Sequence, residues 1–261
     1  MNRLRYPFRS VFWACLAAGW ILFRCGSIFR QGPPLDSDPN ALVAGIQNNA
    51  ARLETYQSSA RFDFVSSSGS FSGILHLKAK LPDSMWVKLE GPFGIDVGVG
   101  CFDRDSARVY SPLQNVLYTA TARKLLIATI MPFSMDTSDL ALGLIGLLVP
   151  KPSILDSIRS INIDGREMVM TLADSERIWI GRGPVVTRWE KRSPDGKIEW
   201  EWVGRDFESD DGIRLPRRVI VTGHRPPRTV VLLFERIKTN RSLDKGWCLL
   251  KVPEGAETVE F

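Results

Sequence analysis

Apolar and polar residues alternate along most of the chain, and this period of two restricts the fold more than any other feature of the sequence. In residues 71–80, for example, Phe71 and Leu77 fall on one side, and His76 and Lys78 fall toward the other. Successive side chains of a β-strand point to opposite faces, so the pattern is typical of strands with one buried face. Short connections containing Gly, Pro or Asp favour an antiparallel meander, and we expect about ten to twelve strands.

Two segments instead have helical character. Residues 39–57 predict an amphipathic helix capped by Asp38, with Leu42 and Ile46 on its apolar face. Residues 122–149 predict a helical pair whose second half is apolar on most faces, which requires burial on more than one side. The many predicted strands indicate a mainly β fold, and the apolar face of amphipathic strands must be covered by other elements. The prediction is a strongly curved antiparallel half-barrel with the helices plugging its concave side.

The N-terminus has the composition of an export signal. Arg3, Arg5 and Arg9 precede thirteen uncharged residues, 11–23, and no acidic residue occurs before Asp36. Thirteen residues are too few for a comfortable membrane span, which needs about 20. A buried core helix is the alternative, but the basic, acid-free flank disfavours it. We therefore predict a signal peptide or membrane anchor at 1–25, a flexible linker at 26–38 and one folded domain at 39–261.

The kind of anchor depends on Cys25, which follows the apolar segment and precedes Gly26 and Ser27. This position is similar to the lipidated cysteine of bacterial lipoproteins. Arg24 departs from that pattern, because a small residue is expected immediately before the cysteine. Lipidation of Cys25 and an uncleaved signal anchor both remain open.

Charge and cysteines limit the function classes. Four of the 34 basic residues lie in the first 24 positions, which leaves 30 basic against 29 acidic residues in the rest of the chain. The folded part therefore lacks the excess of basic residues that a nucleic-acid-binding protein shows. Cys101 and Cys248 could pair in an oxidising compartment. Their spacing matches no disulfide framework, so buried free thiols are the default expectation.

The sequence contains no recognisable catalytic or metal-binding set. His76 and His224 are the only histidines, and neither has a second histidine or a cysteine at metal-ligand spacing. The carboxylate pairs at 103/105 and 210/211 fall in predicted turns, where aspartates usually bond their own backbone. We expect neither an enzyme nor a metal or cofactor.

Large apolar side chains are the more unusual feature. Eight tryptophans occur, six of them after the export segment, and they serve either as ordinary core residues or as the wall of an apolar ligand site. We predict a cavity between the sheet and the helical pair. Its expected lining is Trp86, Leu125, Ile130, Leu144, Leu148, Trp179, Trp200 and Trp202.

A strand-to-strand turn carries Pro92, Phe93 and Gly94 where polar residues are usual. Phe93 is either folded back onto the sheet or presented to an apolar partner such as a bilayer.

Several of these segments together resemble the lipoprotein-localisation (LolA/LolB-like) superfamily. They are MWVKLEGPFGIDVGVG from Met85, RVYSPLQNVLYTA from Arg108, the helical pair ending in LALGLIGLL, the strand start Ala60-Arg61-Phe62 and the ending KVPEGAETVEF. The similarity is greatest to LolB-like outer-membrane lipoprotein receptors and to related uncharacterised bacterial lipoproteins.

The resemblance implies a half-open barrel with a helical lid and a cavity for acyl chains. It equates Phe93 with an exposed leucine that inserts cargo into the membrane, and Cys25 with the lipidated cysteine. The implied partners are lipid or lipoprotein acyl chains, a membrane and a periplasmic carrier protein. The implied location is the bacterial envelope, at the outer membrane facing the periplasm. A non-catalytic structural or interaction lipoprotein of an envelope complex is the alternative function.

Overall fold

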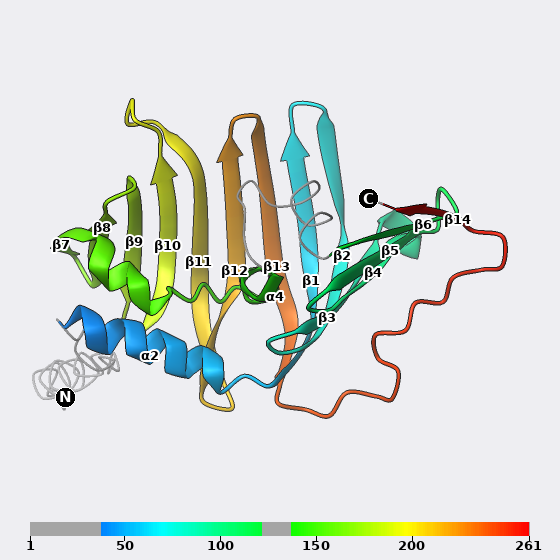
Figure 1. The fold of residues 1–261 in the computed structure, drawn as a ribbon, viewed down its shortest axis with the longest axis horizontal. Helices are drawn as coiled ribbons and strands as arrows, with labels where there is room; N and C mark the ends of the chain where they lie inside the picture. The colour runs from blue at the N-terminus through cyan, green and yellow to red at the C-terminus, as the bar shows by residue number, and fades with distance from the viewer. Residues whose placement is uncertain (1–37, 122–136, 261) are drawn as a thin grey trace, which may run out of the picture. The chain divides into compact units, whose positions relative to one another are not determined.

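The computed structural model describes residues 38–121 and 137–260. They form one curved, open sheet of fourteen strands in the order β14-β6-β5-β4-β3-β2-β1-β13-β12-β11-β10-β9-β8-β7 (Figure 1). All neighbouring strands are antiparallel except β14 and β6, which are parallel. The predicted half-barrel class is therefore confirmed, with more strands than the sequence suggested. The predicted signal, linker and Cys25 lie outside the described residues.

Most strands follow one another directly in the chain through tight turns. The first group is β1 (Thr55–Ser66), β2 (Gly69–Lys80), β3 (Ser84–Glu90), β4 (Asp96–Phe102), β5 (Ser106–Ser111) and β6 (Val116–Thr121). The second group is β7 (Ile158–Asp164), β8 (Glu167–Leu172), β9 (Glu176–Gly181), β10 (Val185–Arg192), β11 (Ile198–Asp210), β12 (Ile213–His224), β13 (Pro227–Thr239) and β14 (Glu257–Glu260). Pairing of β1 with β13 joins the two groups at the centre of the sheet.

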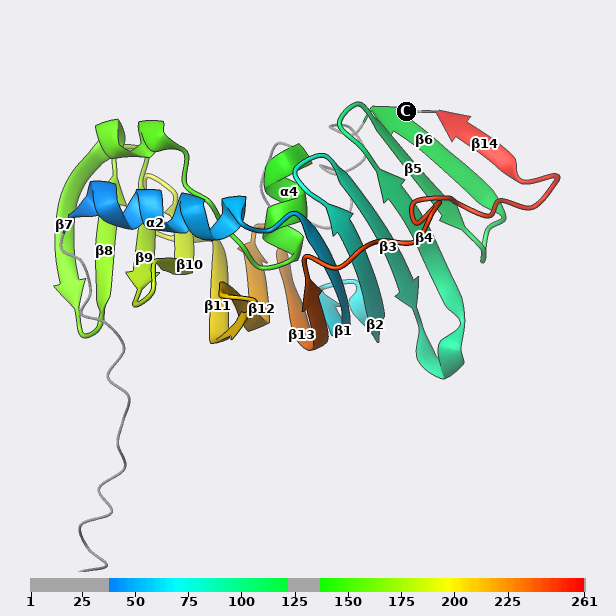
Figure 2. The same ribbon diagram turned by 90° about the horizontal axis from the view of Figure 1, so that it is seen from below.

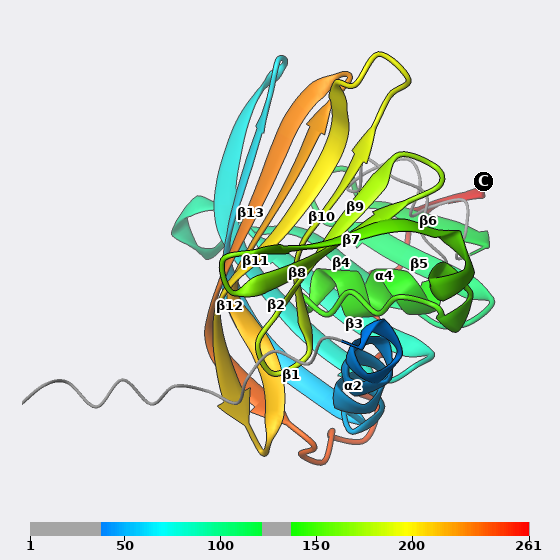
Figure 3. The ribbon, with the colours of Figure 1, turned by 90° about the vertical axis from the view of Figure 1, so that its left-hand side faces the viewer.

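Three helical segments lie on the concave face of the sheet (Figures 2 and 3). They are α2 (Pro39–Ala51), α4 (Thr137–Leu144) and the short 3₁₀ helix η2 (Pro152–Ser157). Leu42, Val43 and Ile46 of α2 are buried against the sheet, and Ile145, which follows α4, joins the same core cluster. Within the described residues, no helix is long and apolar enough to span a bilayer.

The start of α2 is determined by a neighbouring residue, whereas its end contacts a residue far away in the sequence. Asp38 caps the start as predicted, because its Oδ1 accepts a hydrogen bond from the backbone N of Asn40 at 3.0 Å. The helix ends at Ala51, six residues before the predicted end. Asn240, just after β13, donates from Nδ2 to the carbonyl of Arg52 and accepts at Oδ1 from the N–H of Glu54, both at 2.9 Å. This contact across the sheet ends the helix and starts β1.

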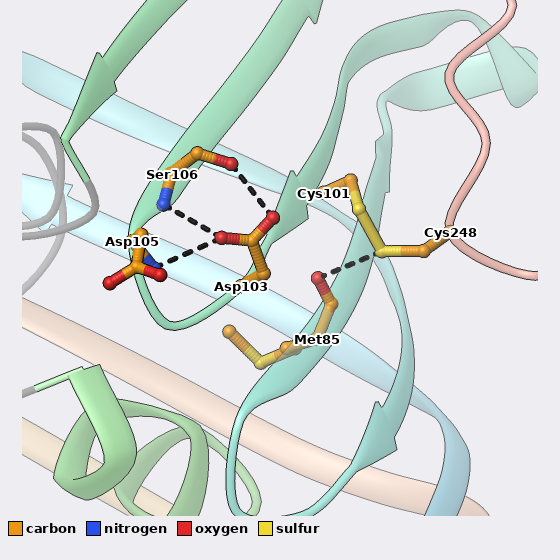
Figure 4. The surroundings of a disulfide bond; sticks show 6 residues. All are labelled: Met85, Cys101, Asp103, Asp105, Ser106 and Cys248. Carbon is orange, nitrogen blue, oxygen red and sulfur yellow. Dashed lines mark hydrogen bonds between the residues drawn. A yellow bond between two sulfur atoms is a disulfide. The ribbon is translucent and has the colours of Figure 1, made fainter.

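Cys101 of β4 and Cys248 form a disulfide, with 5.5 Å between their Cα atoms (Figure 4). The expectation of free thiols is wrong, because the segment after β13 passes beside β4 and brings together two positions separated by 147 residues. The disulfide fixes the segment 240–256, which joins β13 to β14. Residues 245–248 form a turn, and the last strand is β14.

Candidate functional site

An uninterrupted row of apolar side chains crosses the concave face over seven strands, from β9 to β2. Each member is the direct register partner of the next. The row, called the apolar row below, is Ile178, Trp189, Trp202, Val221, Val230, Phe64 and Phe71. All seven belong to the core cluster or pack against it, so they share one face of the sheet.

Exposure varies along the apolar row. Trp202 is fully buried and three aliphatic members are also buried, whereas Trp189, Phe64 and Phe71 are only partly buried. Trp200, two residues before Trp202, is also partly buried, and its ring centroid lies 6.4 Å from that of Trp189. Aromatic and aliphatic side chains arranged in this way can contact an extended hydrocarbon chain without any catalytic group.

A partly buried carboxylate orients Trp189. Nε1 of Trp189 donates a hydrogen bond to Oε2 of Glu176 at 2.8 Å, and Nζ of Lys191 lies 3.5 Å from Oε1 of the same carboxylate. Burial raises the pKa of Glu176, although the Trp189 hydrogen bond and Lys191 act in the opposite direction. The indole is thus held by a group whose ionisation the fold disfavours.

The structure brings only part of the predicted cavity lining together. Leu144, Leu148 and Trp202 lie in one buried cluster, and Trp200 packs against it. Leu125 and Ile130 lie outside the described residues.

Trp86 and Trp179 point to the opposite face of the sheet, away from the predicted lining. Met85 on β3 and Ile178 on β9 belong to the core, so the residue after each must face outward. Lys78 lies 5.4 Å from the ring centroid of Trp86, and the guanidinium of Arg188 lies 4.6 Å from that of Trp179. Strand alternation therefore excludes both tryptophans from the concave face.

The turn between β3 and β4 is a short 3₁₀ helix, η1 (Pro92–Gly94), that presents Phe93 to solvent. The side chain of Phe93 is 100% exposed, and that of Ile95 is 54% exposed. The backbone of Phe93 is left-handed, with φ 62°, a conformation that a bulky residue rarely adopts. Of the two orientations considered for Phe93, the structure has the one directed away from the sheet.

One aspartate of each pair accepts backbone hydrogen bonds, but only Asp103 does so within its own turn, because Asp210 ends β11 and bonds a distant residue. Oδ1 of Asp103 accepts from the backbone N–H groups of Asp105 and Ser106 at 3.0 and 2.7 Å (Figure 4). Burial acts to raise the pKa of Asp103, but the hydrogen bonds from Ser106 outweigh it and lower the pKa. Oδ2 of Asp210 accepts from the N–H of Thr239 at 3.0 Å. In the described ranges, no three His, Cys, Asp or Glu side chains gather as a metal site.

Comparisons of sequence identify no relative: no protein-family model matches the chain, and no curated protein matches it. Solved structures do match. A DUF1329 family protein from Desulfovibrio piger superposes with a TM-score of 0.55 at 11% identity, over 80% of this chain and 95% of the other.

Two further structures agree with that match. A domain named for outer-membrane lipoprotein sorting, from Vibrio parahaemolyticus, has a TM-score of 0.52 at 10% identity and covers 78% of this chain and 94% of its own. A LolA superfamily protein from Nitrosomonas europaea has a TM-score of 0.52 at 11% identity and covers 78% and 96%. At such identities the likeness concerns the fold alone. The described part of the chain therefore shares the fold of these three structures, one of which is a LolA superfamily protein.

Proposed function

We propose that this protein binds the acyl chains of lipids or lipoproteins on its concave face and assists their transfer or insertion into the outer membrane of a bacterium. The observation that carries the proposal is the apolar row, whose partly buried members Trp189, Phe64 and Phe71 offer hydrocarbon contacts beside a packed centre. Each methylene removed from water contributes about 0.8 kcal/mol, so such a face can compete with a bilayer for an acyl chain. Binding of this kind requires no enzyme activity, metal or cofactor.

The turn at Phe93 supplies the second part of the proposal. A fully exposed phenylalanine held in a left-handed turn is directed outward by its backbone, and an apolar side chain in that position favours contact with a membrane. In this role Pro92, Phe93 and Gly94 form a membrane-insertion loop. An N-terminal anchor, either a lipid on Cys25 or an uncleaved signal, would keep the loop near the bilayer, with cargo arriving from a periplasmic carrier.

One observation favours the alternative, a non-catalytic interaction lipoprotein of an envelope complex. Strand β7 is an edge of the sheet, and its side chains Ile161 and Ile163 are exposed. An exposed edge with apolar side chains can pair with a strand of another protein.

Native mass spectrometry of the full chain extracted from membranes tests the acyl-binding proposal, together with titration of a fluorescent fatty acid. We expect co-purified lipid and saturable binding of the probe. A chain that carries no lipid and does not bind the probe would refute acyl binding and leave the interaction role.

A further inference from the structure

A groove of about 400 Å³ lies on the sheet face opposite the helices, over β13, β1, β2 and β3. We call it the outer-face groove. It is lined by Gln57, Ser58, Ser59, His76, Leu77, Lys78, Trp86, Lys88, Glu90, Arg236 and Lys238. Its volume is within the usual range for small-molecule sites, about 300–1,000 Å³. Because it lies on the other side of the sheet from the apolar row, a ligand there would be separate from any acyl chain.

Strand register explains why positive charge collects in the groove. Gln57 is the direct partner of Lys238 on one side and of Lys78 on the other, so the two lysines flank it on one face. Strands lie about 4.8 Å apart, which places the Cα atoms of these lysines about 10 Å from each other. Arg236 points to the same face two residues before Lys238, about 7 Å along β13. Three long cationic side chains can thus converge on one small anion.

A second group of charged side chains at the groove forms a network of ion pairs. Nζ of Lys88 lies 2.7 Å from Oε1 of Glu90 and 2.9 Å from Oδ1 of Asp96, and Nε2 of His76 lies 3.1 Å from Oε2 of Glu90. Hydrogen bonds to Glu90 and Asp96 raise the pKa of Lys88, and those from Lys88 and His76 lower the pKa of Glu90. Lys88 is therefore engaged by two carboxylates, and an anion in the groove would depend on its other cations.

Lys78, Arg236 and Lys238 differ from that network. Over residues 38–121 and 137–260, none of the three forms an ion pair with a carboxylate. Lys78 instead makes a cation–π contact with the ring of Trp86. An arginine fork and two ammonium groups match the several acceptor oxygens of a phosphate better than the two of a carboxylate. We propose that the outer-face groove is a binding site for a phosphate group, held by Lys78, Arg236 and Lys238 beside Trp86.

The end of the groove indicates which phosphate source is favoured. Glu90 borders the groove, and the exposed Phe93 follows it by three residues. Two further exposed side chains are close in sequence or register: Ile95, just before β4, and Ile74, the partner of Glu90 on β2. From Trp86 to Glu90 the strand advances about 13 Å. Apolar side chains at one end and cations behind them suit a bilayer surface, so a lipid headgroup phosphodiester is the expected source, with free phosphate sharing the same chemistry.

Calorimetric titration of the purified full chain at low salt tests the site with two probes that lack acyl chains. Glycerophosphoglycerol, the deacylated headgroup of phosphatidylglycerol, represents the lipid source, and inorganic phosphate represents the free source. Because neither probe has a hydrocarbon chain, the result is independent of acyl binding on the concave face. The indole N–H signal of Trp86 in a nitrogen–proton NMR spectrum, assigned with Trp86→Phe, reports whether the probe enters the groove.

The groove variant is Lys78→Gln/Lys238→Gln, and its matched control is Arg159→Gln/Arg166→Gln, which removes two exposed charges near the far edge of the sheet. We expect the groove variant to bind about tenfold or more weakly, because it loses two charged hydrogen-bond donors, and the control to bind like the wild type. Binding of glycerophosphoglycerol supports a headgroup site, and equal binding of inorganic phosphate supports a free-phosphate site. If neither probe binds, or if both variants bind equally well, the proposal is overturned.

Discussion

Trp189 and Trp202 are direct partners on the neighbouring strands β10 and β11, and both side chains lie on the concave face. The pair has one fully buried member and one that is only partly buried. Trp202 therefore serves the packing of the core, while Trp189 is the partly accessible member of the pair. This division separates the stability of the fold from the proposed binding of acyl chains, and the two can be tested by different substitutions.

Replacement of the buried member should affect stability. Trp202→Ala removes a fully buried indole from the core and leaves a cavity, so the free energy of unfolding should fall by about 3–5 kcal/mol. Urea denaturation followed by circular dichroism measures the change. A decrease below about 1 kcal/mol would mean that the core at Trp202 is not packed as the structure describes.

Replacement of Trp200, the partly buried neighbour of Trp189, should affect binding. Trp200→Ala should weaken binding of a fluorescent fatty acid about tenfold or more, because burial of one large apolar side chain contributes about 1.5–3 kcal/mol. Trp86→Ala is the matched control, since Trp86 lies on the opposite face of the sheet. Equal affinities for the two variants would place the acyl site elsewhere.

The turn at Phe93 can be tested without disturbing the backbone. Phe93→Asp should fold normally, because the side chain is fully exposed and aspartate tolerates a left-handed conformation. Its apolar contact with a bilayer is lost, so transfer of a lipoprotein cargo to vesicles should fall. Phe93→Leu retains a large apolar side chain and should transfer at the wild-type rate. Unchanged transfer by Phe93→Asp would remove the membrane role of this turn.

Glu176 makes the stability of the fold depend on pH. Its pKa is raised by burial, so above the ordinary pKa of glutamate the unfolded chain loses a proton more readily than the folded chain, and the folded state becomes relatively less stable as pH rises. Glu176→Gln keeps an oxygen acceptor for Trp189 and removes this penalty. The variant should be more stable than the wild type at neutral pH, and the difference should vanish in acid. Thermal unfolding at a series of pH values checks this, and a constant difference would contradict it.

The disulfide should stabilise the C-terminal segment. Reduction, or the double substitution Cys101→Ser/Cys248→Ser, opens a loop of 147 residues and should lower the free energy of unfolding by up to about 5 kcal/mol. Urea denaturation with and without reductant provides the measurement. The double variant should not respond to the reductant, and a wild type that also does not respond would mean that the two thiols are unpaired.

The sequence predicted those features that depend on local pattern. Alternation of side chains located the strands, and Asp38 marked the start of α2. The same alternation, applied strictly, separates Trp86 from Met85 and would have removed Trp86 from the cavity lining. Phe93 was conspicuous because turns rarely carry a large apolar residue.

Features made by distant strands could not be predicted. The outer-face groove combines Lys78 from β2 with Arg236 and Lys238 from β13, and their common face depends on how both strands pair with β1. The disulfide likewise joins two segments that are 147 residues apart, and the spacing of the cysteines in the sequence does not predict their contact. The early end of α2 requires Asn240, nearly two hundred residues away.

The central claim is that acyl chains lie on the apolar row, and photo-crosslinking tests it most directly. A fatty acid with a diazirine near the end of its hydrocarbon chain would be bound to the full chain, activated by light and located by peptide mass spectrometry. The account predicts crosslinks in the peptides that contain Trp189, Trp200, Phe64 or Phe71, competed by unlabelled fatty acid. Crosslinks confined to outward-facing residues such as Trp86 and Trp179, or no specific crosslink at all, would contradict it.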